Sequence, residues 1–343
     1  MDCRVHAVVA RGGGLATSAA LAQAGVDPRY VARLVRTGKL VAVRLGVYTT
    51  AELWDSWDDH RGRPLARVRA AEHALAVPHV SSHDSAALVH RLPLLRPQDS
   101  AVHISRLDLR GHRTQHGIEH HGATYDPDQV VEVEGLTLLD IPRTVADLAR
   151  EHGFRAGLVA ADGAMQLGVP RSALRDAAAR MTGWPYSLTV RAVVKAADPG
   201  AESVGETLAR ELAIEGGFGS LVETQFPVAT ASGVAWADLR IGRLLVEFNG
   251  RVKYRSEEDG GLRDSDLEQL LWDERHRESE LRSPGFGLTP LVYADFFGER
   301  RERAKERLCR ECTLTMTRYG TELTPEMAAF ADRLRGRRYK VVD

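Results

Sequence analysis

The chain has 343 residues, of which 43% are hydrophobic and 27% charged, and its formal net charge is −1. This length predicts two or three domains, and no apolar run reaches the 18 residues that a membrane-spanning helix needs. The three cysteines favour a reducing compartment, and the N-terminus lacks the pattern of a signal peptide. We therefore expect a soluble, cytoplasmic protein with no membrane partner.

Charge is distributed unevenly along the chain. Residues 1–50 carry seven Arg or Lys and two Asp, whereas residues 201–282 carry seventeen Asp or Glu and ten Arg or Lys. Residues 333–340 hold five basic side chains and no acid. Separate basic and acidic blocks are typical of a nucleic-acid-binding domain joined to a metal-binding one. For any single block, solvation of the surface is the simpler explanation.

Residues 1–50 predict a winged helix-turn-helix domain. A helix over 4–12 is followed by a second helix that Thr17 caps. Pro28 opens a third helix, and residues 40–49 read as two short strands. In this arrangement the last helix enters the major groove and the strands form the wing; a small domain that contacts other proteins is the alternative. The side chains predicted to bind DNA are Arg29, Tyr30, Arg33, Arg36, Lys39 and Arg44.

Residues 12–50, GGGLATSAALAQAGVDPRYVARLVRTGKLVAVRLGVYTT, closely resemble the N-terminal domain of AbiEi-type antitoxins, the regulators of type IV toxin–antitoxin systems. The resemblance implies a winged helix that binds duplex DNA and regulates its own operon. A cognate toxin is a further partner that it suggests. Whether the chain forms a homodimer is left open.

Residues 51–198 predict an α+β middle domain, with helices over 64–76, 85–92 and 142–150 and strands over 102–105, 118–121 and 136–139. The segment GLTLLDIPRTVADLAR resembles, more weakly, one that follows the winged helix in such antitoxins. Residues 155–200 look helical, with breaks at Gly168 and Gly183. The turn signal at Asp198-Pro199-Gly200 marks a domain boundary.

The middle domain is rich in histidine. A His-rich hairpin could bind metal, but no Cys or carboxylate falls at a standard ligand spacing, so we expect these side chains to be exposed to solvent. Ser82, His83 and Asp84 are adjacent in the chain, and adjacent residues do not easily form a catalytic triad. The histidines concerned are His103, His112, His116, His120 and His121.

Residues 199–312 predict an α/β domain built around a β-hairpin. A helix over 201–216 and an edge strand over 225–229 precede the hairpin of residues 234–254, whose turn is at Ile241-Gly242-Arg243. A helix over 267–282, a strand over 288–293 and a helix through Cys312 follow. Residues 313–343 are expected to form an extension with a basic end, and the Cys309-x-x-Cys312 pair is expected to serve packing or the surface.

The hairpin carries the residues on which a chemical hypothesis depends. It presents Asp238 and Glu247 near its strand ends and Lys253 a few residues later. Two carboxylates followed by a Lys could hold a divalent cation beside a phosphate. Solvated strand carboxylates are the alternative.

The order of helix, strand, hairpin, helix, strand and helix resembles the core of the PD-(D/E)XK nuclease superfamily. Together with WDERHRESELRSPGF at 272–286, the spacing of Glu206, Asp238 and Glu247 is similar to its very-short-patch-repair-type branch. This resemblance implies a Mg²⁺-dependent endonuclease in which Asp238 and Glu247 bind the metal and Glu206 holds a metal-bound water. Lys253 or Arg251 would offset phosphate charge, and Arg275 and Arg277 would clamp the DNA backbone.

One departure from the branch bears on activity. Position 249 holds Asn, where the superfamily usually has Lys and the closer branch an acid. An amide can orient water but contributes no charge, so three readings stay open. The chain is a DNA endonuclease, an RNA-directed nuclease, or an antitoxin-like repressor whose C-terminal domain is inert.

Overall fold

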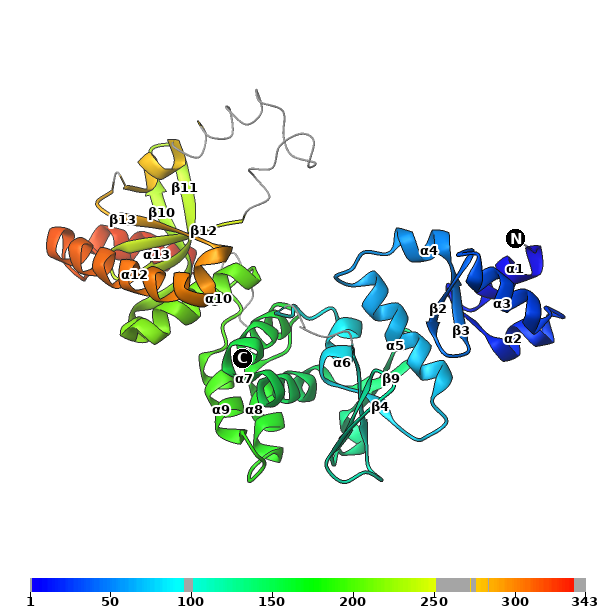
Figure 1. Cartoon of the computed structure of the whole chain (residues 1–343). Coiled ribbons are helices and arrows are strands. Elements are labelled where there is room, and N and C mark those ends of the chain that lie inside the picture. Colours follow the sequence, from blue (N-terminus) through cyan, green and yellow to red (C-terminus); the bar gives the residue numbers. More distant parts are fainter. Residues whose placement is uncertain (1, 96–100, 251–271, 273–275, 283, 336–343) are drawn as a thin grey trace. The chain divides into compact units, whose positions relative to one another are not determined.

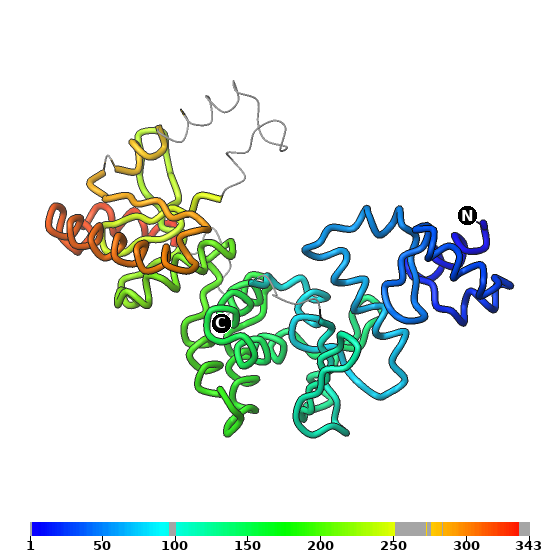
Figure 2. Tube along the Cα trace, in the orientation of Figure 1, coloured from blue at the N-terminus to red at the C-terminus, as the bar shows by residue number. Residues whose placement is uncertain are grey.

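The computed structural model of the chain describes residues 2–95, 101–250, 272, 276–282 and 284–335. Figure 1 shows its helices and strands, and Figure 2 follows the path of the backbone. The chain divides into two compact units, residues 1–151 with 180–185 and residues 152–179 with 186–343. Helices and three β-sheets make up the described residues, which confirms the α/β, multi-part fold class. The finer division into four domains stays a prediction.

The N-terminal part of the first unit has the predicted winged helix-turn-helix arrangement. Thr17 caps the second helix by accepting from Ala20 N at 3.0 Å, and Asp27 caps the third by accepting from Arg29 N at 2.6 Å. The strands pair in the order β1-β3-β2. The elements are α1 (Cys3–Arg11), β1 (Ala16–Thr17), α2 (Ser18–Gln23), α3 (Pro28–Arg36), β2 (Leu40–Arg44) and β3 (Val47–Thr50).

The rest of the first unit is a six-stranded sheet in the order β6-β7-β5-β4-β9-β8. Helices α5 and α6 contact its strand β5, and the core between them includes Val68, Ala86 and Ile104. The helices are α4 (Ala51–Ser56), α5 (Gly62–Ala74) and α6 (His83–His90). The strands are β4 (Val80–Ser81), β5 (Val102–Arg106), β6 (His112–Gln115), β7 (Ile118–Gly122), β8 (Val130–Val133) and β9 (Leu136–Leu139).

A run of helices connects this sheet to the C-terminal one. Helix α7 (Ile141–Gln166) is interrupted at Gly153, whose φ of 83° is not helical. Helices α8 (Arg171–Arg180) and α9 (Ser187–Ala196) follow. The predicted breaks at Gly168 and Gly183 are confirmed, and both glycines have positive φ, which glycine adopts without steric cost.

The second unit contains a four-stranded sheet in the order β10-β11-β12-β13. Strands β10 (Val222–Thr230), β11 (Gly233–Ile241) and β12 (Leu244–Asn249) are antiparallel, and β13 (Gly287–Val292) pairs with β12 in parallel. Strand β10 is the edge strand predicted around Pro227, where a residue without an N–H is tolerated. Residues 276–282 are helical.

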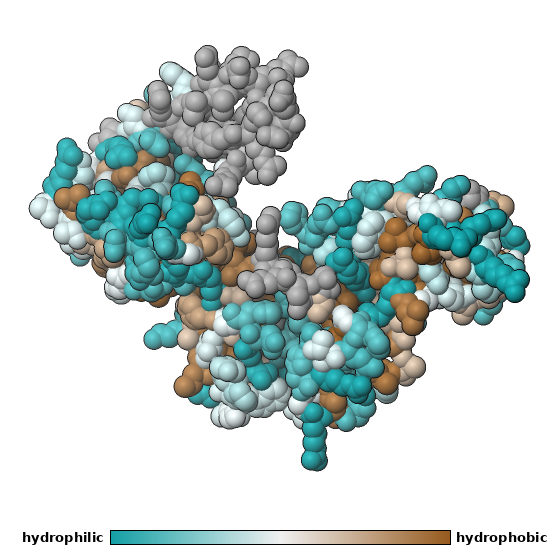
Figure 3. All heavy atoms as spheres, viewed as in Figure 1, coloured by the Kyte–Doolittle hydropathy of each residue, from teal (hydrophilic) through white to brown (hydrophobic). Residues whose placement is uncertain are grey.

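Helices cover this sheet. Helix α10 (Val204–Ala213) contacts β11 and β12, α12 (Gly298–Tyr319) contacts β12 and β13, and α13 (Pro325–Leu334) contacts β10. Figure 3 shows a largely hydrophilic outward side on α12. The expected end of the last helix at Cys312 is wrong, because α12 continues to Tyr319 and α13 packs on the sheet. Cys312 is buried and Cys309 half-buried in α12, and both are free thiols, so the expected packing role fits.

The absence of a membrane-spanning helix, expected from the sequence, was checked in the residues that the structure describes. None of their helices combines the length and the low polarity that crossing a bilayer demands.

Candidate active site

The predicted hairpin is confirmed as far as Asn249, while residues 251–254 lie outside the described residues, and its register brings the two candidate metal ligands together. Ile241 pairs with Leu244 across the turn at Gly242, and Leu239 pairs with Val246. Asp238 and Glu247 each lie one residue beyond that last pair, so they stand opposite each other on neighbouring strands. Asp238 Oδ2 accepts a hydrogen bond from Phe248 N at 2.8 Å, which holds its carboxylate at β12.

Strand β10 is distorted next to Asp238. Its pairing with β11 runs from Val222 to Thr224 and resumes at Phe226, which leaves out Gln225 opposite Asp238. Gln225 has a φ of 48°, a conformation that non-glycine residues rarely adopt. Such distortions re-aim side chains within a sheet and are frequent beside functional sites. Here the amide of Gln225 turns toward the carboxylates.

Glu206 joins this group from the first turn of α10. Ser203 caps the helix, and its hydroxyl donates to Glu206 Oε1 at 2.8 Å. Glu206 Oε2 accepts from Glu202 N at 2.9 Å and from Gln225 Nε2 at 3.0 Å. Three hydrogen bonds therefore fix the carboxylate of Glu206. The sequence had not indicated Gln225 as its partner.

A glycine sets the distance between α10 and β12. A Cβ placed on Gly205 would lie 2.1 Å from the ring of Phe248, so only glycine allows the helix to approach the strand this closely. Phe248 in turn packs on Phe296, with ring centroids 5.9 Å apart. This contact positions Glu206 beside the hairpin.

The three carboxylates repel one another in a buried site. Burial first, and the charge of Asp238 second, raise the pKa of Glu206 to about 7. The same two causes raise the pKa of Glu247 to about 7, while Arg277 acts in the opposite direction. A cluster of acids that holds protons near neutral pH is typical of sites that bind a cation or transfer a proton.

Glu247 has one oxygen paired and one oxygen available. Arg277 Nη2 lies 3.1 Å from Glu247 Oε2 and also donates to Trp236 O at 2.9 Å. Within the described residues, the buried Glu247 Oε1 has no hydrogen-bond partner. A buried oxygen of this kind needs a partner, and a bound cation would supply it.

The geometry is incomplete as a metal cage. Among the described residues, Glu206, Asp238 and Glu247 do not form one of the groups of three ligands close enough to share an ion as they stand. Asp238 and Glu247 still offer two carboxylates on neighbouring strands. Mg²⁺ is often coordinated by only one or two carboxylates, together with water and phosphate oxygens. Asn249 is half-buried at the end of β12. Lys253 and Arg275 lie outside the described residues.

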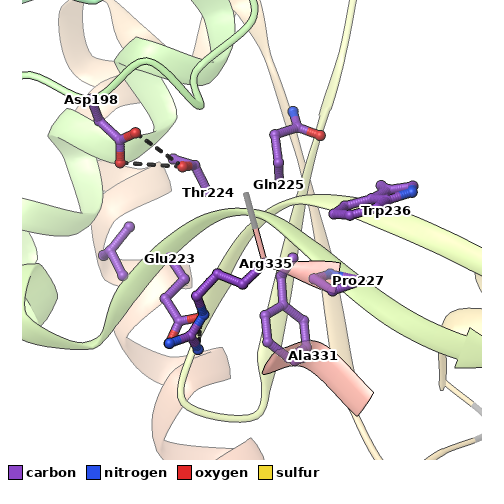
Figure 4. A pocket seen from close by; sticks show the side chains of 10 residues that line it. Asp198, Glu223, Thr224, Gln225, Pro227, Trp236, Ala331 and Arg335 are labelled. Carbon is purple, nitrogen blue, oxygen red and sulfur yellow. Dashed lines mark hydrogen bonds and ion pairs between the residues drawn. The ribbon is translucent and has the colours of Figure 1, made fainter. Parts of the chain in front are cut away.

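A pocket adjoins the site on the side of β10. Figure 4 shows Gln225, Thr224 and Trp236 among its lining residues, with Asp198 bonded to the Thr224 hydroxyl at 3.2 Å. Because Gln225 both lines the pocket and holds Glu206, the carboxylate group and the pocket share a wall.

In the winged helix, the predicted DNA-binding side chains fall into two groups. Arg29, Arg33, Arg36 and Lys39 are exposed on or just after α3, as expected. Tyr30 is half-buried, and its hydroxyl accepts from Asp2 N at 3.2 Å while Arg33 stacks on its ring at 4.8 Å. It therefore supports the helix as well.

Arg44, also predicted to bind DNA, lies at the end of β2 and is less accessible than Arg29, Arg33 and Arg36. It is half-buried and donates to His116 O at 2.6 Å. The tip carries Leu45 instead, which is 96% exposed.

The expectation of exposed histidines is wrong for three of the five. His103, His120 and His121 are buried, whereas His112 and His116 are exposed. His103 and His121 lie on neighbouring strands β5 and β7, and they meet His83 from the start of α6. Sequence reasoning missed this cluster because the parallel pairing of β5 with β7 is not a local feature.

Comparison with known proteins bears on the first part of the chain. Residues 4–51 match a family model described as a transcriptional regulator, AbiEi antitoxin. No curated protein matches the chain. The match spans α1 to β3, so the winged helix is similar to the regulator domain of AbiEi antitoxins, which supports DNA binding by this part of the chain.

Proposed function

We propose that this chain binds duplex DNA through its winged helix and hydrolyses phosphodiester bonds with its C-terminal domain, using Mg²⁺. The observation that carries the hydrolytic part is the convergence of Glu206, Asp238 and Glu247, with a buried Glu247 oxygen that lacks a partner among the described residues. The helix, antiparallel strands and parallel strand around them fit the PD-(D/E)XK core that the sequence resembles.

Asp238 and Glu247 are the residues that would hold the cation. When bound, such a cation neutralises charge on the scissile phosphate and lowers the pKa of a bound water. Both ligands are oxygens, which Mg²⁺ prefers. Asp238 Oδ2 accepts a hydrogen bond from Phe248 N, which fixes the carboxylate against the backbone of β12.

Glu206 would handle the proton of the attacking water. Its pKa of about 7 allows it to accept a proton near neutral pH and to release it again. Its three hydrogen bonds keep it in place during that exchange. Arg277, which pairs with Glu247 here, would be able to pair with a substrate phosphate instead, because Arg binds both carboxylates and phosphates.

A nicking assay tests this proposal. Purified protein is incubated with supercoiled plasmid and Mg²⁺, and the wild type is expected to nick it and to stop when EDTA is added. Asp238→Asn and Glu247→Gln should each reduce nicking at least about 100-fold, since each removes a metal ligand. Glu299→Gln, which changes a 90% exposed side chain on α12, is the matched control. Nicking that survives in both site variants would contradict the proposal.

A repressor with an inert C-terminal domain is the second candidate. The observations that favour it are the Arg277–Glu247 ion pair, which already neutralises one carboxylate, and the uncharged Asn249. This candidate predicts retention of DNA in a mobility-shift assay with no cleavage of plasmid or of labelled RNA. Cleavage of labelled RNA without cleavage of plasmid would identify the chain as an RNA-directed nuclease.

A further inference from the structure

Three buried histidines meet in the first unit, far along the chain from the carboxylates. His83, His103 and His121 each offer a ring nitrogen, and these atoms lie within 4.8 Å of one another. His103 Nδ1 is 3.0 Å from His121 Nε2. The rings of His83 and His121 stack with centroids 3.8 Å apart. One nitrogen of each imidazole therefore lies within reach of the other two.

The fold brings these rings together from three elements. Strands β5 and β7 run parallel. Ser105 on β5 lies opposite His121 on β7, and His103 lies two residues before Ser105 on β5. Alternation along the strands puts His103 and His121 on one face, while Ile104 and Ile118 point to the core on the other. His83 begins α6 with a φ of 49°, a conformation that costs energy for a non-glycine residue.

The cluster is chemically suited to a cation. Burial and the neighbouring His103 push the pKa of His83 well below its ordinary value. Burial and His83 lower the pKa of His121 to about 2. Imidazole nitrogen is a common ligand of divalent transition metals, and three such nitrogens lie within reach of one another here.

Polar side chains stand behind two of the rings. His103 directs Nδ1 toward His121, while its Nε2 lies 3.9 Å from Asp84 Oδ2. In zinc sites a carboxylate often bonds to the second nitrogen of a histidine ligand, and Asp84 would have to move closer to His103 to form that bond. The Ser82 hydroxyl lies 3.0 Å from His83 Nδ1.

Charged side chains surround the three histidines. Asp147 and Arg143 form a buried ion pair at 3.0 Å, and Arg150 lies 3.6 Å from the other Asp147 oxygen. The ring of His112, beside His121 at 4.9 Å, stands on the exposed strand β6 and is bonded to Glu119. Asp84 adds a negative charge next to the rings.

We propose that His83, His103 and His121 bind one divalent transition-metal ion, with Zn²⁺ the best fit. Zn²⁺ takes imidazole nitrogens at about 2.0 Å, which places the nitrogens of a tetrahedral site about 3.4 Å apart. His103 Nδ1 and His121 Nε2 are already 3.0 Å apart, whereas the stacked rings of His83 and His121 must tilt apart for both to face one ion. Three histidines leave a fourth position for water. This site does not depend on the function proposed for the second unit.

Metal binding to the full chain tests the inference. Protein stripped with EDTA is titrated with Zn²⁺ and, separately, with Co²⁺, whose visible absorption reports its ligands. One tight site per chain and a tetrahedral Co²⁺ spectrum are expected. His121→Asn should weaken binding at least about 100-fold, because it removes one of three ligands. His116→Asn is the control, because His116 is an exposed histidine in the turn before the same strand.

Two further measurements test whether the three histidines, and not the carboxylates of the second unit, bind the metal. The Asp238→Asn/Glu247→Gln double variant must bind Zn²⁺ as the wild type does, which separates this site from the carboxylates. If His121→Asn does not fold, anomalous scattering from wild-type crystals grown with Zn²⁺ gives the answer, with a peak expected between the three rings. A peak elsewhere, or stoichiometry unchanged in folded His121→Asn, would overturn the inference and leave the rings as a packed, hydrogen-bonded cluster.

Discussion

Arg277 Nη2 lies 3.1 Å from Glu247 Oε2, so the acid expected to bind a cation already carries a positively charged neighbour. Arg277 comes from the helical residues 276–282, and Glu247 from the central strand β12. A divalent ion must therefore compete with a guanidinium that is about half exposed. The Arg277–Glu247 ion pair stabilises the carboxylate cluster when no cation is bound, and a divalent cation could replace the guanidinium.

Removing the guanidinium should strengthen metal binding. The Arg277→Gln variant removes the competing charge. Because the ion pair is partly exposed, it contributes only about 0.5 kcal/mol, so its loss should raise the affinity for the metal roughly twofold. Isothermal titration with Mn²⁺ at fixed salt measures the change. Arg303→Gln, on the exposed side of α12, serves as the control. Weaker binding in Arg277→Gln would show that the guanidinium supports the site instead.

The raised pKa values predict how stability depends on pH. Glu206 and Glu247 have pKa values of about 7 in the folded protein against ordinary values of 4.5. Between these values the folded state binds more protons than the unfolded state, so without metal the free energy of unfolding falls as pH rises from about 4.5 to 7. Urea denaturation at pH 5 and pH 8 measures it.

The Glu206→Gln/Glu247→Gln double variant isolates this contribution. It should lose less stability than the wild type between the two pH values, because the amides do not titrate. Metal binding by the wild type should strengthen over the same range. Equal pH dependence in wild type and variant would show that these two acids titrate normally.

The close approach of α10 to β12 predicts a sharp steric effect. Gly205→Ala places a Cβ 2.1 Å from the Phe248 ring, so the helix must shift, at an expected cost of about 1–3 kcal/mol. The shift carries Glu206 with it and should also reduce plasmid nicking. Chemical denaturation and the nicking assay report the two effects. The control is Gly219→Ala, whose Cβ would lie 3.7 Å from Ile214, an ordinary van der Waals distance.

The exposed arginines of α3 predict salt-dependent DNA binding. Arg33→Ala/Arg36→Ala should weaken retention of duplex DNA and lower the slope of log affinity against log salt by about 0.9 for each phosphate that the variant no longer neutralises. Fluorescence anisotropy over a salt series gives both values. Arg303→Ala, 75% exposed and outside the winged helix, is the comparison. A slope that stays the same would argue against α3 as the recognition helix.

Local chemistry is what the sequence predicts well. Thr17 and Pro28 mark the helix starts of the winged helix, and Gly242 marks the hairpin turn, because capping and turn formation depend on residues close in the chain. The opposition of Asp238 and Glu247 follows from that turn. Because opposed residues of antiparallel strands project to the same face of the sheet, both side chains lie on one face of the hairpin.

Interactions between distant segments are not predicted in the same way. The Gln225–Glu206 hydrogen bond depends on a distorted strand pairing with β11, and the Arg277–Glu247 ion pair on where a later helix packs. The burial of His103 and His121 follows from a parallel pairing of β5 with β7, and no local pattern in the sequence indicates which face of these strands is covered. Because histidine is polar, the sequence predicts that these side chains are exposed to solvent, but the pairing of β5 with β7 buries them.

The central claim is that Asp238 and Glu247 share one cation, and a crystal structure with Mn²⁺ tests it most directly. Mn²⁺ prefers the same oxygen ligands as Mg²⁺ and scatters anomalously. The expected result is a single anomalous peak between the two carboxylates, absent from crystals of Glu247→Gln. Clear density for both side chains, with Arg277 still bonded to Glu247 and no peak at millimolar Mn²⁺, would contradict it.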